Sequence, residues 1–221
     1  MKALVIGASR GIGREFVRQY LEAGAQVTAS ARSAEGVAEL EALGATAFVL
    51  DVTDAVSASG VAWRVDNAGF DVAIVNAGVY GPSTAGLETP TEADFDQVMH
   101  TNVLGAMRVI PQLSDALAEG AKLAVLSSQM GSIGARTGTS GWLYRASKAA
   151  LNSVLKDASI ALEGRACCIA FHPGWVQTDM GGAHATLTPQ KSVADMRATL
   201  ARVTPDQNGS FLNHDGSAIV W

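Results

Sequence analysis

The sequence has few cysteines, no cluster of like charges and no long apolar run. Its only cysteines, Cys167 and Cys168, are adjacent in an apolar stretch and give no disulfide framework. The four histidines, at positions 100, 172, 184 and 214, lack the spacing of metal ligands, so we expect no bound metal. No apolar stretch reaches the roughly 20 residues that a membrane helix needs. These absences predict reduced cysteines and count against a membrane partner.

Charge and length narrow the class of protein further. The 16 basic and 21 acidic residues give a net charge of −5, and no basic cluster is present to follow a phosphate backbone, which counts against a nucleic-acid partner. The N-terminal apolar run is too short for the core of a signal peptide. We expect a soluble, cytoplasmic protein with one domain over residues 1–221.

Short apolar runs alternate with helical patterns along the whole chain. The expected strands cover residues 2–6, 26–30, 46–50, 71–75, 122–128, 166–173 and 210–213, and the longer expected helices cover residues 10–24, 34–44, 93–119, 142–162 and 189–203. Such alternation predicts parallel strands joined by crossover helices. The expected fold is a doubly wound α/β Rossmann domain with about seven parallel strands and helices on both faces.

Three loops are candidates for substrate contacts. Residues 79–91, 131–141 and 181–190 are rich in Gly, Pro, Ser and Thr, and each follows an expected strand. Ligands of doubly wound sheets bind beyond the carboxyl ends of the strands. Just after the second loop, Trp142 either flanks the reacting group, which would suit an aromatic or apolar substrate, or packs against the start of its own helix.

A glycine-rich turn follows the first expected strand and precedes a helix. Gly7, Gly11 and Gly13 lack Cβ atoms, so a pyrophosphate can approach backbone N–H groups at the helix N-terminus. Ser9, Arg10 and Ile12 belong to the same turn. The spacing G-x-x-x-G-x-G differs from the more widely used G-x-G-x-x-G, but the strand–turn–helix context favours dinucleotide binding.

The end of the second expected strand bears on the choice of dinucleotide. A carboxylate there binds the ribose 2′-hydroxyl of NAD, whereas arginine suits a 2′-phosphate. The chain has Ala31 and Arg32 at this point, and Arg10 in the glycine turn can reach the same phosphate. NADP(H) is therefore the preferred cofactor, with NAD(H) as the alternative.

Tyr144 and Lys148 lie four residues apart in an expected helix and therefore share one of its faces. The ammonium favours the phenolate, which makes Tyr144 a usable acid or base near neutral pH. Together with a dinucleotide site, this pair indicates hydride chemistry.

With the glycine turn, Asn76-Ala77-Gly78, Ser128 and the Tyr144/Lys148 pair in this order, the chain resembles the short-chain dehydrogenase/reductase family over essentially its whole length. GASRGIG looks like the family's T-G-x-x-x-G-x-G with Ile6 in place of threonine. The resemblance implies that Ser128 orients the substrate, with Ser127 as the less suitable neighbour. It also implies that the backbone carbonyl of Asn102 holds a water in a proton relay.

The same resemblance assigns further cofactor contacts. It implies that Asp51, with Val52, contacts the adenine and that the segment Asn76, Ala77 and Gly78 lines the cofactor. In HPGWVQT, which resembles the family's N-P-G-x-V-x-T, Pro173 and Gly174 match the P-G pair, while Val176 and Thr178 match the groups that hold the nicotinamide carboxamide. His172 replaces the usual asparagine and is either a buried hydrogen-bonding residue or a pH-sensitive neighbour of the site.

The C-terminal segment NGSFLNHDGSAIVW looks like that of a compact branch that includes the Sniffer-type carbonyl reductases and the bacterial C-factor proteins. The resemblance implies NADPH-dependent, reversible reduction of a ketone or aldehyde, with Tyr144 as the general acid and Lys148 also contacting the nicotinamide ribose. The alternatives are an NAD-dependent alcohol or diol dehydrogenase and a cofactor-binding regulatory or signalling protein. The expected partner is a small carbonyl or alcohol, and a homodimer or homotetramer stays open.

Overall fold

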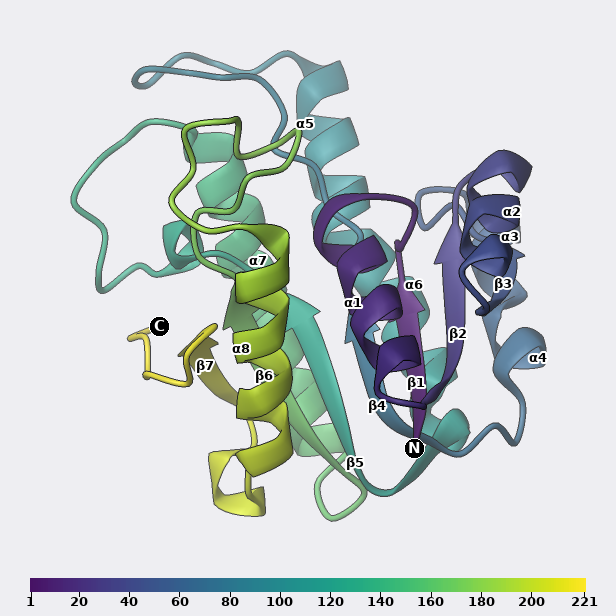
Figure 1. Cartoon of the computed structure of the whole chain (residues 1–221). Helices are drawn as coiled ribbons and strands as arrows, with labels where there is room; N and C mark the ends of the chain where they lie inside the picture. The colour runs from purple at the N-terminus through teal and green to yellow at the C-terminus, as the bar shows by residue number, and fades with distance from the viewer.

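The computed structural model describes all 221 residues around one parallel sheet of seven strands, with helices on both of its faces (Figure 1). The strand order is β3-β2-β1-β4-β5-β6-β7, as predicted for a doubly wound sheet. The strands are β1 (Lys2–Ile6), β2 (Gln26–Ala31), β3 (Thr46–Val49), β4 (Phe70–Val75), β5 (Leu117–Leu126), β6 (Ala166–His172) and β7 (Ser210–Asn213). The order reverses between β1 and β4, where such folds bind their ligands.

Both faces of the sheet are buried, which explains why its strands are continuous apolar runs. In β1, Leu4 and Ile6 belong to a core cluster of 28 buried residues on one face, and Ala3 and Val5 belong to a cluster of 24 on the other. Because strand side chains alternate between faces, each apolar residue of the run faces one of the two cores.

The helices divide between the two faces. One core packs under α1 (Gly11–Glu22), α2 (Ala34–Ala42) and α8 (Pro189–Arg202), and the other under α3 (Ala55–Ser59), α4 (Val61–Val65), α6 (Gly105–Leu113) and α7 (Trp142–Ala161). The helix α5 (Glu92–Met99) precedes α6 and contacts α7. No helix has the length and apolar character needed to cross a membrane.

The expected helix over residues 93–119 is wrong in two respects. A π-helical segment, η1 (His100–Leu104), separates α5 from α6, and β5 begins at Leu117, five residues earlier than predicted. Pro111 lies inside α6 and lacks the N–H that a continuing helix needs. Leu117 instead pairs with Phe70 of β4, so sheet pairing overrides the helical preference of the segment DALAE.

Candidate active site

The glycine turn between β1 and α1 is packed too tightly for larger residues. A Cβ at Gly13 would lie 2.3 Å from the Gly7 carbonyl oxygen, and one at Gly7 would lie 2.9 Å from the backbone of Ala77. Gly7 also has a φ of 81°, in the left-handed region that favours glycine. The side-chain amide of Asn76 donates to the Gly7 carbonyl at 2.6 Å, so β4 fixes the shape of the turn.

The start of α1 fits an anionic group. Its N-cap, Arg10, makes no side-chain capping hydrogen bond, and the first turn contains no acidic residue. The first N–H groups of the helix, with their partial positive charge, therefore stay available for a phosphate. A cavity of about 120 Å³ opens beside the turn and is lined by nine of the predicted cofactor residues: Gly7, Ser9, Arg10, Arg32, Asp51, Val52, Asn76, Ala77 and Gly78. We name it the nucleotide cavity.

The charged groups of the nucleotide cavity are only partly paired. Arg10 forms an exposed ion pair with Asp179 at 2.7 Å, whereas Arg32 has no ion-pair partner in the chain. The Asp51 carboxylate accepts from the Thr53 hydroxyl at 2.7 Å and from the Thr53 N–H at 2.8 Å. These bonds, aided by the charge of Arg32, lower the pKa of Asp51, so the cavity contains one fixed carboxylate and one free guanidinium.

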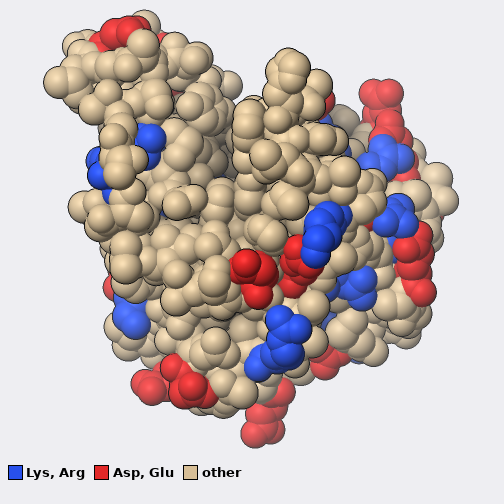
Figure 2. All heavy atoms as spheres, turned by 60° about the vertical axis from the view of Figure 1, so that its left-hand side comes forward, with Lys and Arg blue, Asp and Glu red and all other residues tan.

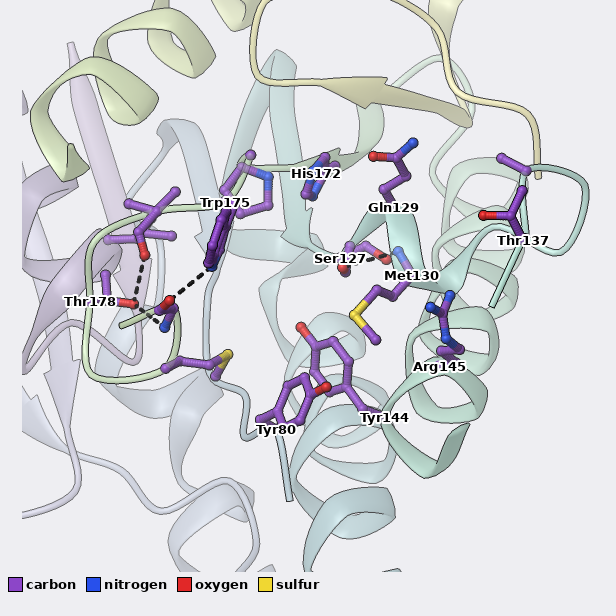
Figure 3. Close-up of a pocket in the computed structure, with 18 residues that line it drawn as sticks. Tyr80, Ser127, Gln129, Met130, Thr137, Tyr144, Arg145, His172, Trp175 and Thr178 are labelled. Carbon is purple, nitrogen blue, oxygen red and sulfur yellow. Dashed lines mark hydrogen bonds between the residues drawn. The ribbon is translucent and has the colours of Figure 1, made fainter. Parts of the chain in front are cut away.

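A larger cavity of about 600 Å³ lies beyond the carboxyl ends of β5 and β6 (Figure 3). Its wall includes Ser128 and Tyr144 together with five predicted cofactor residues, Ile12, Pro173, Gly174, Val176 and Thr178. We name it the reaction cavity. Its volume falls within the range of small-molecule sites.

The two cavities meet at α1. A Cβ on Gly11 would lie 3.2 Å from the methyl carbon of Thr178, so the glycine turn touches the loop that follows β6. Thr178 in turn accepts a hydrogen bond from the Gly181 N–H at 3.2 Å. One extended ligand can therefore span both cavities along this contact.

Tyr144 is a buried phenol at the floor of the reaction cavity. Burial raises its pKa to about 12; an interaction with the Ser128 hydroxyl opposes this rise, and Tyr80 adds to it. The rings of Tyr80 and Tyr144 are 4.7 Å apart between centroids (Figure 3). At neutral pH the phenol is therefore protonated and available as a proton donor.

Lys148 lies beneath the cavity wall, with its side chain only 3 % exposed. Its Nζ donates to the Leu126 carbonyl at 2.7 Å and lies 5.6 Å from the centre of the Tyr144 ring. Burial lowers the pKa of Lys148 to about 8. In the chain alone, burial is the largest influence on the pKa of Tyr144, and the effect that Lys148 has on this phenol stays a prediction.

Asn102 lies at the centre of the π-helical segment η1 and is buried. Its side-chain oxygen accepts from the Val79 N–H at 2.8 Å, and its amide donates to the Val79 carbonyl at 2.8 Å and to Ser147 at 2.9 Å. A Cβ on Gly78 would lie 3.3 Å from both the Asn102 side-chain oxygen and the Lys148 Nζ. The structure thus brings Asn102, Gly78 and Lys148 together, although neither Asn102 nor Lys148 lines a cavity.

The two serines after β5 have different surroundings. The Ser127 hydroxyl donates to Asn152 at 2.5 Å within the buried interior. The Ser128 hydroxyl accepts from the Met130 N–H at 3.1 Å and lies in the wall of the reaction cavity, where it interacts with Tyr144. Geometry therefore favours Ser128 over Ser127, as the sequence did.

His172 lies in the wall of the reaction cavity. Its Nδ1 atom is buried without a hydrogen-bond partner, so His172 is not a satisfied structural residue. Burial, with a contribution from His214, lowers its pKa to about 4. His172 therefore lines the reaction cavity as a neutral ring near neutral pH and does not sense pH there.

Sequence reasoning singled out Trp142 for the reaction cavity and missed several residues that line it. Trp142 does not line the cavity; its indole N–H donates to the Glu88 carbonyl at 2.9 Å, in the loop 79–91. Trp175 and Met180 line it instead, and Tyr80 covers Tyr144. Tyr80 belongs to the loop 79–91 that was predicted to contact substrate, but no spacing signal distinguished it from its neighbours.

The fold, the glycine turn and the buried tyrosine and lysine define a nucleotide-dependent oxidoreductase. A family description for short chain dehydrogenases matches residues 1–187. The chain therefore belongs to the short-chain dehydrogenase/reductase family. It is 38% identical over 154 residues to C-signal from Myxococcus xanthus, an alignment covering 68% of this chain and 92% of that protein.

Solved structures show the same fold over the entire chain. A short-chain dehydrogenase/reductase from Burkholderia multivorans with bound NADP superimposes with a TM-score of 0.89 at 29% identity, covering 100% of this chain and 99% of that one. The carbonyl reductase Sniffer of D. melanogaster superimposes with a TM-score of 0.88 at 27% identity, with coverage of 100% and 99%. The chain thus has relatives of both kinds that its C-terminal segment predicted.

Proposed function

We propose that this protein reduces a ketone or aldehyde to an alcohol with NADPH, reversibly. The observation that carries the proposal is the position of Tyr144, a protonated phenol that faces the reaction cavity between Ser128 and the loop after β6. Both structural relatives described above support it, one by its bound NADP and the other by its carbonyl reductase activity.

A bound nicotinamide nucleotide supplies the hydride. Gly7, Gly11, Gly13 and the open N–H groups of α1 bind its phosphates, and Val176 and Thr178 orient its nicotinamide end. Asp51 and Val52 contact the adenine, and Asn76 keeps the turn in its binding shape. The residues present fit this group because larger side chains at Gly7 and Gly13 would fill the space that it needs.

The acid–base roles belong to four residues. Ser128 donates a hydrogen bond to the carbonyl oxygen, and Tyr144 donates the proton that the developing alkoxide requires. Lys148 stabilises the negative charge that develops on the phenol as its proton leaves, because Lys148 remains an ammonium below its lowered pKa of about 8. Asn102 is fixed by its hydrogen bonds to Val79 and lies near Lys148, and its backbone carbonyl would hold the water through which the proton of Tyr144 is replaced.

Preference for NADPH rests on Arg32. Its guanidinium lines the nucleotide cavity without an acidic partner, and no carboxylate follows β2. Arg10 is already paired with Asp179, so it is the weaker of the two candidates for the 2′-phosphate. The direct test is an assay of carbonyl reduction and alcohol oxidation with both nicotinamide nucleotides. Turnover with NADH equal to that with NADPH would refute the preference.

The likeness to C-signal favours one other candidate, a nucleotide-binding signalling protein. Such a protein would bind NADP(H) tightly and turn over no carbonyl across a broad panel. The reductase is preferred because Ser128, Tyr144 and Lys148 keep the geometry of an acid–base site, which nucleotide binding alone does not need.

A further inference from the structure

The reaction cavity contains one permanently charged side chain. Of the 18 residues that line it, none is acidic, and the only Lys or Arg is Arg145, since His172 is neutral. On the face shown in Figure 2, acidic and basic side chains are mixed around a largely uncharged hollow. A lone cation in such a wall adds a specific polar contact to a site that is otherwise suited to apolar groups.

Arg145 is fixed in place but has an unused hydrogen-bonding edge. It is half-buried beside Tyr144 on α7, and its Nε donates to the Ser140 carbonyl at 2.8 Å. Neither of its two Nη atoms has an acceptor, and no carboxylate of the chain forms an ion pair with it. A guanidinium presents paired N–H groups that match the two oxygens of a carboxylate.

The loop that precedes α7 is held by the C-terminal segment. The Ser132 hydroxyl donates to the Val220 carbonyl at 2.6 Å, and the Gly134 N–H donates to the Trp221 carbonyl at 2.8 Å. The Trp221 ring stacks on Phe211 of β7. The segment that carries Ala135 and Thr137 is therefore supported from the sheet, which keeps the free edge of Arg145 beside a preformed cavity.

The nucleotide does not account for this charge. Its phosphates belong to the nucleotide cavity, whose cations are Arg10 and Arg32, and Arg145 does not line that cavity. In Figure 3, Arg145 lies with Thr137 and Gln129 on the side of Tyr144 opposite Trp175 and Thr178, the residues of the cofactor side. A ligand group that meets Arg145 therefore comes from the substrate.

We propose that the substrate is an oxocarboxylic acid, whose carboxylate pairs with Arg145 while its carbonyl oxygen meets Ser128 and Tyr144. This inference rests on the proposed function and names its substrate class. The apolar part of the molecule, between the two groups, packs against side chains that line the same cavity on this side of Tyr144, among them Met130. The carbonyl is reduced to an alcohol and the carboxylate is unchanged.

The test compares 4-oxo-4-phenylbutanoate with its methyl ester, which share one ketone and differ in charge. We expect wild-type protein with NADPH to show a kcat/KM at least about tenfold higher for the acid, the value of a charge-assisted hydrogen bond. The substitution Arg145→Gln lowers kcat/KM for the acid about tenfold or more and leaves that for the ester within about twofold. Arg145→Lys restores part of the preference for the acid, because it restores the charge.

Arg136→Gln is the matched control, because Arg136 is an exposed arginine of the loop that precedes α7 and does not line the cavity. It changes neither substrate's kinetics. Equal losses for acid and ester in Arg145→Gln, or a wild-type preference for the ester, would overturn the inference.

A binding measurement that needs no turnover tests the role of Arg145 separately from the proposed reaction. Calorimetry on the NADP⁺-loaded protein compares 4-phenylbutanoate, which has no ketone, with its amide. Tighter binding of the carboxylate that is lost in Arg145→Gln supports the inference even if no ketone is reduced. Reduction of the ester without any preference for the carboxylate would retain the reductase and refute the role of Arg145.

Discussion

The nucleotide cavity and the reaction cavity are built in different ways. The nucleotide cavity is formed by backbone and by short contiguous motifs, such as the glycine turn and Asn76-Ala77-Gly78. The reaction cavity is formed by single side chains from distant segments, among them Tyr80, Met130, Arg145 and Trp175. A site that binds an invariant cofactor can be fixed by backbone shape, whereas a site that selects a substrate depends on individual side chains.

Three residues connect the two cavities. Gly78 borders the nucleotide cavity and lies close to Asn102 and Lys148, and the Lys148 Nζ lies 5.6 Å from the centre of the Tyr144 ring. This arrangement predicts that substitutions in the nucleotide cavity weaken nucleotide binding and that those in the reaction cavity slow the chemical step. A substitution at Lys148 should alter the chemical step because it alters the charge beside Tyr144. Four substitutions test that division.

The largest effect is expected at Tyr144. Tyr144→Phe removes the proton donor and keeps the ring that packs against Tyr80, so kcat should fall by about 10²- to 10⁴-fold. The dissociation constant of NADPH, measured by fluorescence titration, should stay within about twofold of the wild-type value. A variant that kept most of its turnover would rule out Tyr144 as the acid.

Gly13→Ala should have the reverse effect, on the nucleotide cavity. The added Cβ would lie 2.3 Å from the Gly7 carbonyl oxygen and 2.7 Å from the Asn76 amide, so the turn has to open. We expect NADPH affinity to fall at least about tenfold and the free energy of unfolding to drop by about 1–3 kcal/mol, as in other overpacked sites. Calorimetry and denaturant unfolding measure the two quantities.

Gly86→Ala is the control for this change, because a Cβ there meets no atom within 4 Å and the residue has no positive φ. It should leave nucleotide affinity and stability unchanged. If Gly13→Ala bound NADPH as tightly as Gly86→Ala, the glycine turn would not be the phosphate site.

Arg32→Asp tests whether the nucleotide cavity selects NADPH over NADH through Arg32. It removes the unpaired guanidinium and adds a charge that repels a 2′-phosphate, so kcat/KM for NADPH should fall by about 10- to 100-fold. The kcat/KM for NADH should change by less than about threefold. Arg202 is an exposed residue of α8, so the control substitution Arg202→Asp should leave kcat/KM unchanged with both nucleotides. Equal losses with both nucleotides would show that Arg32 does not read the 2′-phosphate.

The pH dependence of reduction tests Lys148, which connects the two cavities. Burial lowers its pKa to about 8, so the ammonium is present below pH 8 and is lost as the pH rises above that value. We expect kcat/KM for carbonyl reduction to be level from pH 6 to about pH 8 and then to fall by up to about tenfold per pH unit.

Lys148→Arg keeps a charged group over this range and should remove the alkaline fall, provided that circular dichroism and NADPH binding show an intact fold. A wild-type profile that stayed level to pH 10 would mean that the charge of Lys148 has no part in the reaction.

The sequence predicted the nucleotide cavity far better than the reaction cavity, for a physical reason. Gly7, Gly13 and Asn76 lie next to strands whose apolar runs are unmistakable, so their positions follow from the fold. Tyr80, Trp175 and Arg145 reach the reaction cavity through loop and side-chain conformations that no local spacing encodes. The start of β5 at Leu117 was likewise missed, because pairing with Phe70 is a contact between distant segments.

The environment of the acid–base pair was the other limit of prediction. The spacing of Tyr144 and Lys148 placed them on one helix face correctly, but it gave no measure of how deeply each is buried. Burial raises the pKa of Tyr144 to about 12 and lowers the pKa of Lys148 to about 8, and helix spacing alone predicts neither shift.

The central claim is that hydride passes from a nucleotide at the glycine turn to a carbonyl held by Ser128 and Tyr144. The most direct measurement follows the label from NADPH deuterated at C4 of the nicotinamide into the alcohol product, by mass spectrometry, with wild-type protein and a panel of ketones and aldehydes. The account predicts one deuterium on the carbinol carbon of at least one product. Tight NADPH binding with no labelled alcohol from any member of the panel would contradict it.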